Sequence, residues 1–205
     1  MITNKHHYFI LAELIIYLYF LAGDLFGFDT SLIKYAGIVL CFVRAVYKKN
    51  RIIALAFGLT LISDFFLLIL NRYYVVGVCV FILIQMTYLY FLYREECNLY
   101  FILRGLMLAA GLLLLITNKQ INVLYAVTLF YFINLLGNTL SSFSNPKLRM
   151  MSLGFVLFVC CDICVGLNNL LQPDVLHRIV NFSMWFFYLP SQVLICLGSE
   201  KVLKK

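Results

Sequence analysis

Charged residues are scarce in this chain of 205 residues, in which Asp, Glu, Lys and Arg together make up only 12%. A soluble domain carries about a quarter charged residues. Hydrophobic residues make up 64%, and the mean hydropathy is +0.97. This composition excludes a soluble globular protein, a disordered chain and a fibrous one. The net charge of +7 does not indicate nucleic-acid binding, because the basic residues lie between long apolar runs.

The sequence also lacks the short motifs of common hydrolases and metal sites. The patterns H-E-x-x-H and G-x-S-x-G and a phosphate-cradling loop are absent. Three of the seven cysteines, Cys160, Cys161 and Cys164, cluster without a neighbouring histidine, and we interpret them as packing residues. We therefore expect no metal site, and the sequence indicates no cofactor.

Long apolar runs occupy most of the chain. A helix that crosses a bilayer needs about 20 apolar residues, and eight runs approach that length. The runs are Tyr8–Phe26, Leu32–Val46, Ile52–Leu70, Tyr74–Tyr93, Leu99–Thr117, Ile121–Leu140, Met150–Asn168 and Leu176–Leu197. They are continuous and rich in Leu, which favours helices over membrane strands. The sequence predicts an all-α fold, a polytopic transmembrane bundle of eight helices that forms a single integral membrane domain over residues 1–205.

The Lys and Arg residues predict the orientation of this bundle. Eight spans put both termini on one side, and that side receives 12 basic residues whereas the other receives 4. The larger group is Lys5, Arg44, Lys48, Lys49, Arg51, Arg94, Arg104, Lys147, Arg149, Lys201, Lys204 and Lys205, and the smaller is Lys34, Arg72, Lys119 and Arg178. By the positive-inside rule both termini are cytoplasmic. We expect an integral protein of a bacterial cell membrane.

Two segments of the chain resemble each other at an offset of 98 residues. Aligning Arg51–Asn71 with Arg149–Asn169 gives six identities in 21 positions, and Asp64 falls on Asp162. A parallel 4+4 repeat explains this match, and chance similarity of apolar helices explains it equally well. Each aspartate follows its arginine by 13 residues, which places both carboxyls roughly 20 Å from the cytoplasmic edge.

Ionisable side chains inside predicted spans are candidates for function, because a charge in lipid costs a few kcal/mol or more. Glu13, Asp64 and Asp162 are the clear cases. Glu13 is near the cytoplasmic end of its span, and we expect it to reach the interface. Asp64 and Asp162 are the candidate catalytic residues. The alternative is that their carboxyls only tie helices together by hydrogen bonds.

Polar side chains at helical spacing accompany both aspartates. Thr60, Asp64 and Asn71 are predicted to share one face of a helix, as are Asp162 and Asn169. Other spans contribute Gln85, Tyr88, Tyr131, Asn134, Asn138, Tyr188 and Gln192. Lipid would leave these polar atoms unpaired, so together they predict a polar cavity inside the bundle. Taken singly, an interhelical hydrogen bond explains each of them better than a ligand contact does.

Three blocks of sequence resemble the YhhN-like lysoplasmalogenase family of small eight-span membrane proteins. The first is LTLISDFFLLIL at Leu59–Leu70, followed by a span that contains FILIQMTYLYFL. The second is GFVLFVCCDICVGLN at Gly154–Asn168, and the third is the ending FYLPSQVLICLG. Their order and spacing agree with the family over roughly residues 34–198. The resemblance implies the same eight-span fold.

The same resemblance implies hydrolysis of the vinyl ether bond of lysoplasmalogens, which releases a fatty aldehyde and a glycerophospho-alcohol. Such cleavage protonates a vinyl carbon and adds water to the resulting cation, so it needs an acid and a group that stabilises the cation and activates water. Asp64 and Asp162 are expected to fill both roles, as two carboxyls do in glycoside hydrolysis. Expected substrate-binding residues are Gln85, Tyr88, Tyr131, Asn134, Tyr188 and Gln192. The expected partners are the lysophospholipid substrate and membrane lipids.

The chain departs from the family pattern at three positions. Ser63 stands where a Gly commonly precedes the first aspartate, and Cys161 stands where a Ser commonly precedes the second. Gln85 stands where the family commonly has a His in the fourth span. Losing that His removes a possible acid, base or ligand, so this departure affects the activity more than the fold.

Two other classes of function use the same residues. A transporter or lipid-binding protein would use the buried Asp pair as a proton or cation site. A structural membrane protein would use the carboxyls only to hold helices together. A dead-end pocket with both carboxyls close together favours hydrolysis, a pathway open to both sides in turn favours transport, and a filled bundle centre favours the structural role.

Overall fold

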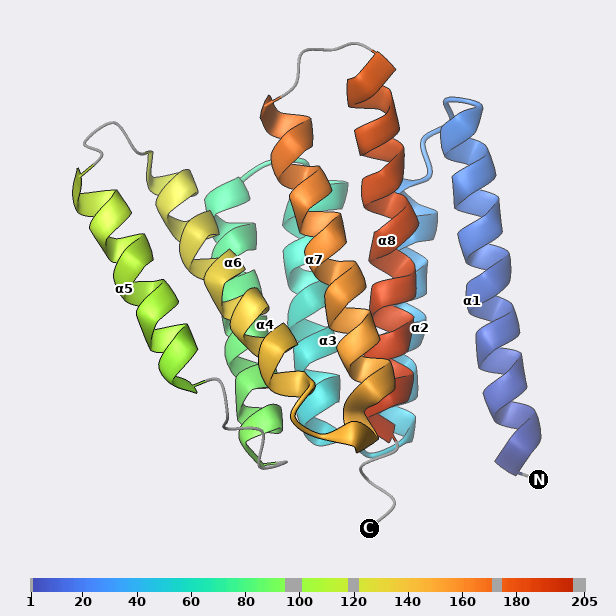
Figure 1. The fold of residues 1–205 in the computed structure, drawn as a ribbon. Coiled ribbons are helices and arrows are strands. Elements are labelled where there is room, and N and C mark those ends of the chain that lie inside the picture. Colours follow the sequence, from blue (N-terminus) through green and yellow to red (C-terminus); the bar gives the residue numbers. More distant parts are fainter. Residues whose placement is uncertain (1, 95–100, 118–121, 171–174, 201–205) are drawn as a thin grey trace.

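The computed structural model describes residues 2–94, 101–117, 122–170 and 175–200, and every regular element in these ranges is a helix (Figure 1). The eight long helices are α1 (Ile2–Leu25), α2 (Ser31–Tyr47), α3 (Arg51–Asp64), α4 (Tyr74–Arg94), α5 (Phe101–Thr117), α6 (Val123–Ser142), α7 (Arg149–Leu170) and α8 (Val175–Glu200). A π-helical turn, η1 (Phe65–Ile69), follows α3, and a 3-10 turn, η2 (Pro146–Leu148), precedes α7. The predicted all-helical fold is confirmed.

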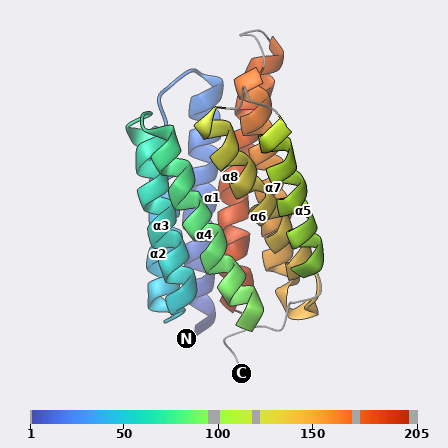
Figure 2. The ribbon, with the colours of Figure 1, turned by 90° about the vertical axis from the view of Figure 1, so that its left-hand side faces the viewer.

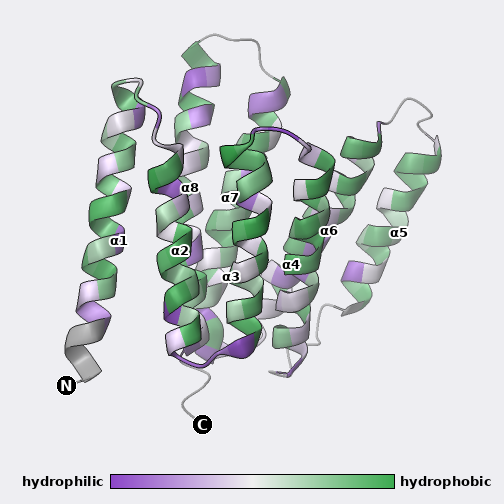
Figure 3. Cartoon of the chain, turned by 180° about the vertical axis from the view of Figure 1, so that it is seen from behind, coloured by the Kyte–Doolittle hydropathy of each residue, from purple (hydrophilic) through white to green (hydrophobic). Residues whose placement is uncertain are grey.

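Six of the described helical segments are long and apolar enough to cross a membrane. They are α1, α3 with η1, α4, α6, η2 with α7, and α8. The other two helices, α2 and α5, have 17 residues each, which corresponds to about 26 Å. Hydrophobic residues cover most of the helix surfaces, and hydrophilic ones gather at the turn between α2 and α3 (Figure 3). The chain therefore has the character of a helical integral membrane protein.

Consecutive helices run in opposite directions, so the odd-numbered helices point one way and the even-numbered helices the other (Figure 1). We call basal the end of the bundle that carries Ile2, the α2–α3 turn and Glu200, and apical the opposite end. The predicted starts of two runs, Leu99 and Ile121, lie outside the described residues. So do four of the basic residues that were used to predict orientation, namely Lys119, Lys201, Lys204 and Lys205.

The helices pack around one apolar core, with α1 and α5 at opposite flanks (Figures 1 and 2). Among the described contacts, α1 packs on α2 and α8, and α5 packs on α6. The closest approach is between α7 and α8. Gly154 lies against the backbone of Ser191 and Ile195, and Gly198 lies against the backbone of Met151. Small residues allow such close approach between membrane helices.

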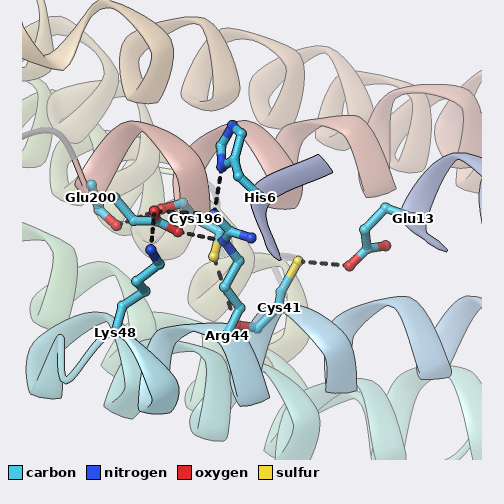
Figure 4. A network of polar contacts seen from close by, with 8 residues as sticks. His6, Glu13, Cys41, Arg44, Lys48, Cys196 and Glu200 are labelled. Carbon is cyan, nitrogen blue, oxygen red and sulfur yellow. Dashed lines mark hydrogen bonds and ion pairs between the residues drawn. The ribbon is translucent and has the colours of Figure 1, made fainter. Parts of the chain in front are cut away.

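A cluster of charged side chains joins α1, α2 and α8 at the basal end (Figure 4). Arg44 on α2 forms an ion pair with Glu200 on α8, and its Nη2 lies 2.7 Å from Nδ1 of His6 on α1. Lys48 adds a second ion pair, with Nζ 3.5 Å from Oε2 of Glu200. The guanidinium of Arg44 also lies 4.3 Å from the ring centroid of Phe9. The contacts of Arg44 with His6 and Phe9 hold the peripheral helix α1 on the bundle, and the two ion pairs join α2 to α8.

Glu13 lies deeper than the sequence predicts. Its side chain is only 3% exposed, so it does not reach the interface. The thiol of Cys41 donates to its Oε1 at 3.5 Å, and its Oε2 has no hydrogen-bond partner (Figure 4). The reason is local packing, because α2 presents the small residues Gly37 and Cys41 to α1 at this level.

Candidate functional site

The first candidate catalytic residue, Asp64, is the last residue of α3 and is 5% exposed. Its Oδ2 accepts a hydrogen bond of 2.6 Å from the hydroxyl of Tyr188 on α8. The preceding residue, Ser63, donates from its hydroxyl to the carbonyl of Gly77 on α4 at 2.8 Å. The end of α3 is therefore fixed to two neighbouring helices, and the Asp64 carboxyl is held inside the bundle.

The second candidate, Asp162, lies in the middle of α7 and is partly buried. Its Oδ2 accepts a hydrogen bond of 2.5 Å from the hydroxyl of Tyr131 on α6. Tyr131 is 6% exposed, so this contact is also inside the bundle. Each candidate carboxyl therefore has its own tyrosine donor on a neighbouring, oppositely directed helix.

Aromatic rings connect the two Asp–Tyr pairs. The ring of Phe81 lies 5.4 Å from that of Tyr131, and the ring of Phe158 lies 6.0 Å from both Phe81 and Tyr188. Phe81 is 8% exposed and Phe158 is 1% exposed. This arrangement differs from the polar cavity that the sequence predicts between the carboxyls, because two apolar side chains fill the space between the tyrosines.

A cavity of about 540 Å³ opens at the apical end, between the start of α2, η1 and α8. We call it the apical groove. Its lining residues are Asp29, Ser31, Leu32, Leu67, Leu68, Ile69, Asn71, Asn181, Met184 and Trp185. Leu68 follows Asp64 by one helical turn, and Trp185 precedes Tyr188 by about one turn. The groove therefore ends about 5 Å along the helices from the Asp64–Tyr188 pair.

Asp29 gives the apical groove a negative charge. It lies in the loop between α1 and α2, and its carboxylate accepts a hydrogen bond of 3.0 Å from the backbone N–H of Ser31. This hydrogen bond lowers the pKa of Asp29 below its usual value. The groove is therefore a polar opening that water can fill, rather than an apolar slot.

The sequence predicts that Thr60, Asp64 and Asn71 share one face of a helix, and this prediction is wrong for Asn71. Residues Phe65–Ile69 wind as a π-helix, which rotates the following residues relative to an α-helical register. Asn71 lies in the turn after it, with φ of 48°, and its Oδ1 accepts a hydrogen bond of 2.7 Å from Tyr74. Asn71 therefore lines the apical groove instead of facing Asp64. Single π-helical turns occur frequently at functional sites.

A third polar cluster lies nearer the basal end. Gln85 on α4 is fully buried, and its Oε1 accepts a hydrogen bond of 2.8 Å from Nδ2 of Asn138 on α6. Arg104 on α5 donates from Nη2 to Oδ1 of the same Asn138 at 2.7 Å. Arg104 is a buried residue that the sequence did not single out. Its position near the end of an apolar run indicated only a charge at the membrane edge.

The other predicted binding residues are interior but separate from the aspartates. Tyr88 is fully buried, its hydroxyl has no hydrogen-bond partner, and its ring packs edge-on against Phe155 at 5.2 Å. Asn134 donates to a carbonyl of its own helix. Gln192 donates to the preceding serine at 3.4 Å, and its Oε1 is unpaired. The structure thus brings Tyr188 to Asp64 and Tyr131 to Asp162, and it leaves these three outside both pairs.

The chemistry available at these sites is proton transfer. The hydrogen bonds of Tyr131 and Tyr188 engage Oδ2 of each carboxyl and orient it. In the part of the chain that the structure describes, no three His, Cys, Asp or Glu side chains gather closely enough to hold a metal ion.

The model of the YhhN family matches residues 29–199. The matched region runs from the loop before α2 to the last turn of α8, and it contains both Asp–Tyr pairs and the Arg104 cluster. Helix α1, including Glu13 and His6, lies outside it. No curated protein and no solved structure matches the chain.

Proposed function

Since the chain belongs to the YhhN family, we propose that it is a membrane-embedded hydrolase that cleaves the vinyl ether bond of lysoplasmalogens. The products are a fatty aldehyde and a glycerophospho-alcohol. The observation that carries this proposal is the pair of carboxyls inside the bundle, each oriented by a tyrosine. Ionisable groups held within a membrane are expensive, and a catalytic role accounts for their cost.

The reaction divides naturally between the two carboxyls. A protonated carboxyl transfers its proton to the vinyl carbon that does not carry the ether oxygen, which leaves an oxocarbenium cation. A water molecule then adds to the ether-bearing carbon and gives up a proton to the second carboxylate. The hemiacetal collapses when its bond to the glycerol oxygen breaks. That oxygen takes up a proton, the hemiacetal hydroxyl loses one, and the aldehyde leaves.

We assign water activation to Asp64 and protonation to Asp162. Asp64 lies next to the apical groove, whose polar lining supports its use as a water route. Asp162 lies on the opposite side of the aromatic rings of Phe81 and Phe158. Those rings suit the alkenyl chain, and aromatic faces attract a cation through their quadrupole. In this arrangement the vinyl ether lies along the rings, between the acid and the water.

The test is aldehyde release by purified protein supplied with a lysoplasmalogen in detergent micelles. Asp64→Asn and Asp162→Asn should each lower kcat by at least 100-fold, because neither amide can exchange the required proton. Glu13→Gln is the matched control, since Glu13 is also a carboxyl buried in a helix but lies outside the family match. Wild-type turnover by either aspartate variant would refute the assignment.

The alternative is a transporter or lipid-binding protein that uses the two carboxyls as proton or cation sites. The packing of Phe81 and Phe158 between the tyrosines fits the structural role instead, because that role predicts a filled centre. A transporter would have to move these rings before a substrate could reach both carboxyls. It predicts that lysophospholipid binds but that no vinyl ether substrate releases aldehyde. The same assay, run alongside a binding measurement, separates the two functions.

We further propose that all eight helices cross a bacterial cell membrane with the basal end in the cytoplasm. Most described Lys and Arg residues lie at that end, whereas Lys34, Arg72 and Arg178 lie towards the apical end. We also propose a parallel 4+4 repeat, which is supported by the sequence match that aligns Asp64 with Asp162. Reporter fusions after Glu200 and within the α1–α2 loop test the orientation. An extracytoplasmic reporter signal after Glu200 would overturn it.

A further inference from the structure

The guanidinium of Arg104 is buried without a counter-ion. Its side chain is 4% exposed, and no carboxylate among the described residues lies within ion-pair distance. Nη2 donates to Asn138, but the enclosed Nη1 has no hydrogen-bond partner. Gly137 lies against the guanidinium, where any side chain would collide with it. The space on α6 is thus shaped to admit the arginine, yet no carboxylate in the part of the chain that the structure describes compensates its charge.

A second unused donor lies in the same cluster. Gln85 is fully buried, and its Oε1 is taken by Asn138, but its Nε2 has no partner. Asn138 accepts one hydrogen bond from Arg104 at Oδ1 and donates from Nδ2 to Gln85, so it satisfies one donor of Arg104 and none of Gln85. Arg104 also lies in the first turn of α5, where backbone N–H groups lack helical partners. The cluster is rich in donors and poor in acceptors.

A buried, unpaired positive charge is strongly unfavourable, and an anion is the ligand that removes this cost. A phosphate suits the site because arginine binds phosphate oxygens through two parallel N–H groups. We propose that Arg104 and Gln85, positioned by Asn138, bind the phosphate of a lysophospholipid headgroup. The ligand enters from the basal side, because Arg104 lies in the basal turn of α5.

The position of this anion site fits the hydrolysis of a vinyl ether at Asp162. This part of the inference rests on the proposed function. Asn138 follows Tyr131 by seven residues on α6, so the two lie on one face about 10 Å apart. Tyr131 holds the Asp162 carboxyl. The glycerol backbone of a lysoplasmalogen separates its phosphate from its vinyl ether by a distance of this order. A phosphate on Arg104 therefore places the vinyl ether next to Asp162.

Binding to purified protein in detergent tests the site without any catalysis. The probes are a saturated 1-alkyl lysophospholipid, which has no vinyl ether, and the alkylglycerol of the same chain, which has no phosphate. Wild-type protein should bind the lysophospholipid at least tenfold more tightly than the alkylglycerol. Arg104→Gln should abolish that preference, and Arg104→Lys should keep part of it. Arg94→Gln, which removes an exposed arginine at the end of α4, should behave as wild type.

The melting temperature provides an independent readout. An uncompensated charge predicts that Arg104→Gln is at least as stable as wild type without ligand, and that lysophospholipid stabilises only wild type. Competition by inorganic phosphate would identify a site for free phosphate as well as for headgroups. Equal binding of both probes by wild type would overturn the proposal, as would a loss of ligand-free stability in Arg104→Gln. A phosphate preference without aldehyde release would refute the hydrolase and leave the anion site standing.

Discussion

Tyr188 on α8 donates a hydrogen bond of 2.6 Å to Asp64 on α3, although 124 residues separate the two along the chain. Tyr131 makes the equivalent contact with Asp162, at 2.5 Å, from α6 to α7. In both cases a tyrosine on a descending helix meets an aspartate on an ascending one. Both contacts lie inside the bundle, so they determine how each carboxyl is oriented.

Removing either tyrosine hydroxyl should therefore affect stability and turnover together. Tyr188→Phe and Tyr131→Phe keep the ring packing but leave a buried carboxyl oxygen without its donor, which costs about 1–3 kcal/mol. We expect a lower melting temperature in detergent and a fall in kcat with little change in KM. Tyr88→Phe is the matched control, because that hydroxyl is buried without a partner. An equal loss in Tyr88→Phe would show that the hydroxyl contacts are not the cause.

The close packing between α7 and α8 should be equally sensitive to an added methyl group. Gly198→Ala places a methyl group against the backbone of Met151, and Gly154→Ala places one against Ser191 and Ile195. Such overpacking typically costs about 1–3 kcal/mol. Gly166→Ala, on the same helix α7 but facing open space, should be neutral or slightly stabilising. Thermal unfolding of the three variants in one detergent makes the comparison, and similar behaviour of all three would contradict the packing argument.

The basal ion pairs should hold α2 against α8 and fix the Arg44 guanidinium that contacts α1. Glu200→Gln leaves the Arg44 guanidinium without its carboxylate, and we expect a loss of about 1–3 kcal/mol because hydrogen bonds to charged groups are of that size. Lys48→Gln breaks only a contact of 3.5 Å from a side chain that is 31% exposed, so its effect should be at most about 1 kcal/mol. Thermal unfolding in one detergent compares the two variants, and the melting temperature should fall further in Glu200→Gln than in Lys48→Gln. A larger loss of stability in Lys48→Gln than in Glu200→Gln would contradict this prediction, because Lys48 and not Arg44 would then make the more stabilising contact.

The fold followed from properties of single helices, which is why it was predictable. Runs of apolar residues and the positions of Asp64 and Asp162 depend on spacing along one segment. The partners of those aspartates depend on which helices are neighbours, and residues far apart in sequence, such as Asp64 and Tyr188, carry no local signal of contact. The tyrosines were therefore found as polar interior residues without being assigned to a particular carboxyl.

Two features of the site depend on backbone geometry that composition does not encode. The π-helical turn Phe65–Ile69 is as apolar as an α-helix, so the sequence placed Asn71 on the wrong face. Arg104 is buried because Gly137, on another helix, leaves room for its guanidinium. From the sequence alone, an arginine near the end of an apolar run predicts a charge at the membrane edge.

Narrowing the apical groove should slow hydrolysis without affecting substrate binding. Leu68→Trp adds a large ring to the groove wall one turn from Asp64, and it should restrict the water that Asp64 is proposed to activate. We expect kcat for aldehyde release to fall at least tenfold while lysophospholipid affinity stays within twofold. Leu55→Trp is the control, since it lines a separate cavity of about 550 Å³ between α3 and α4. Equal inhibition by both substitutions would mean that bulk on α3 and η1, rather than access to Asp64, limits the reaction.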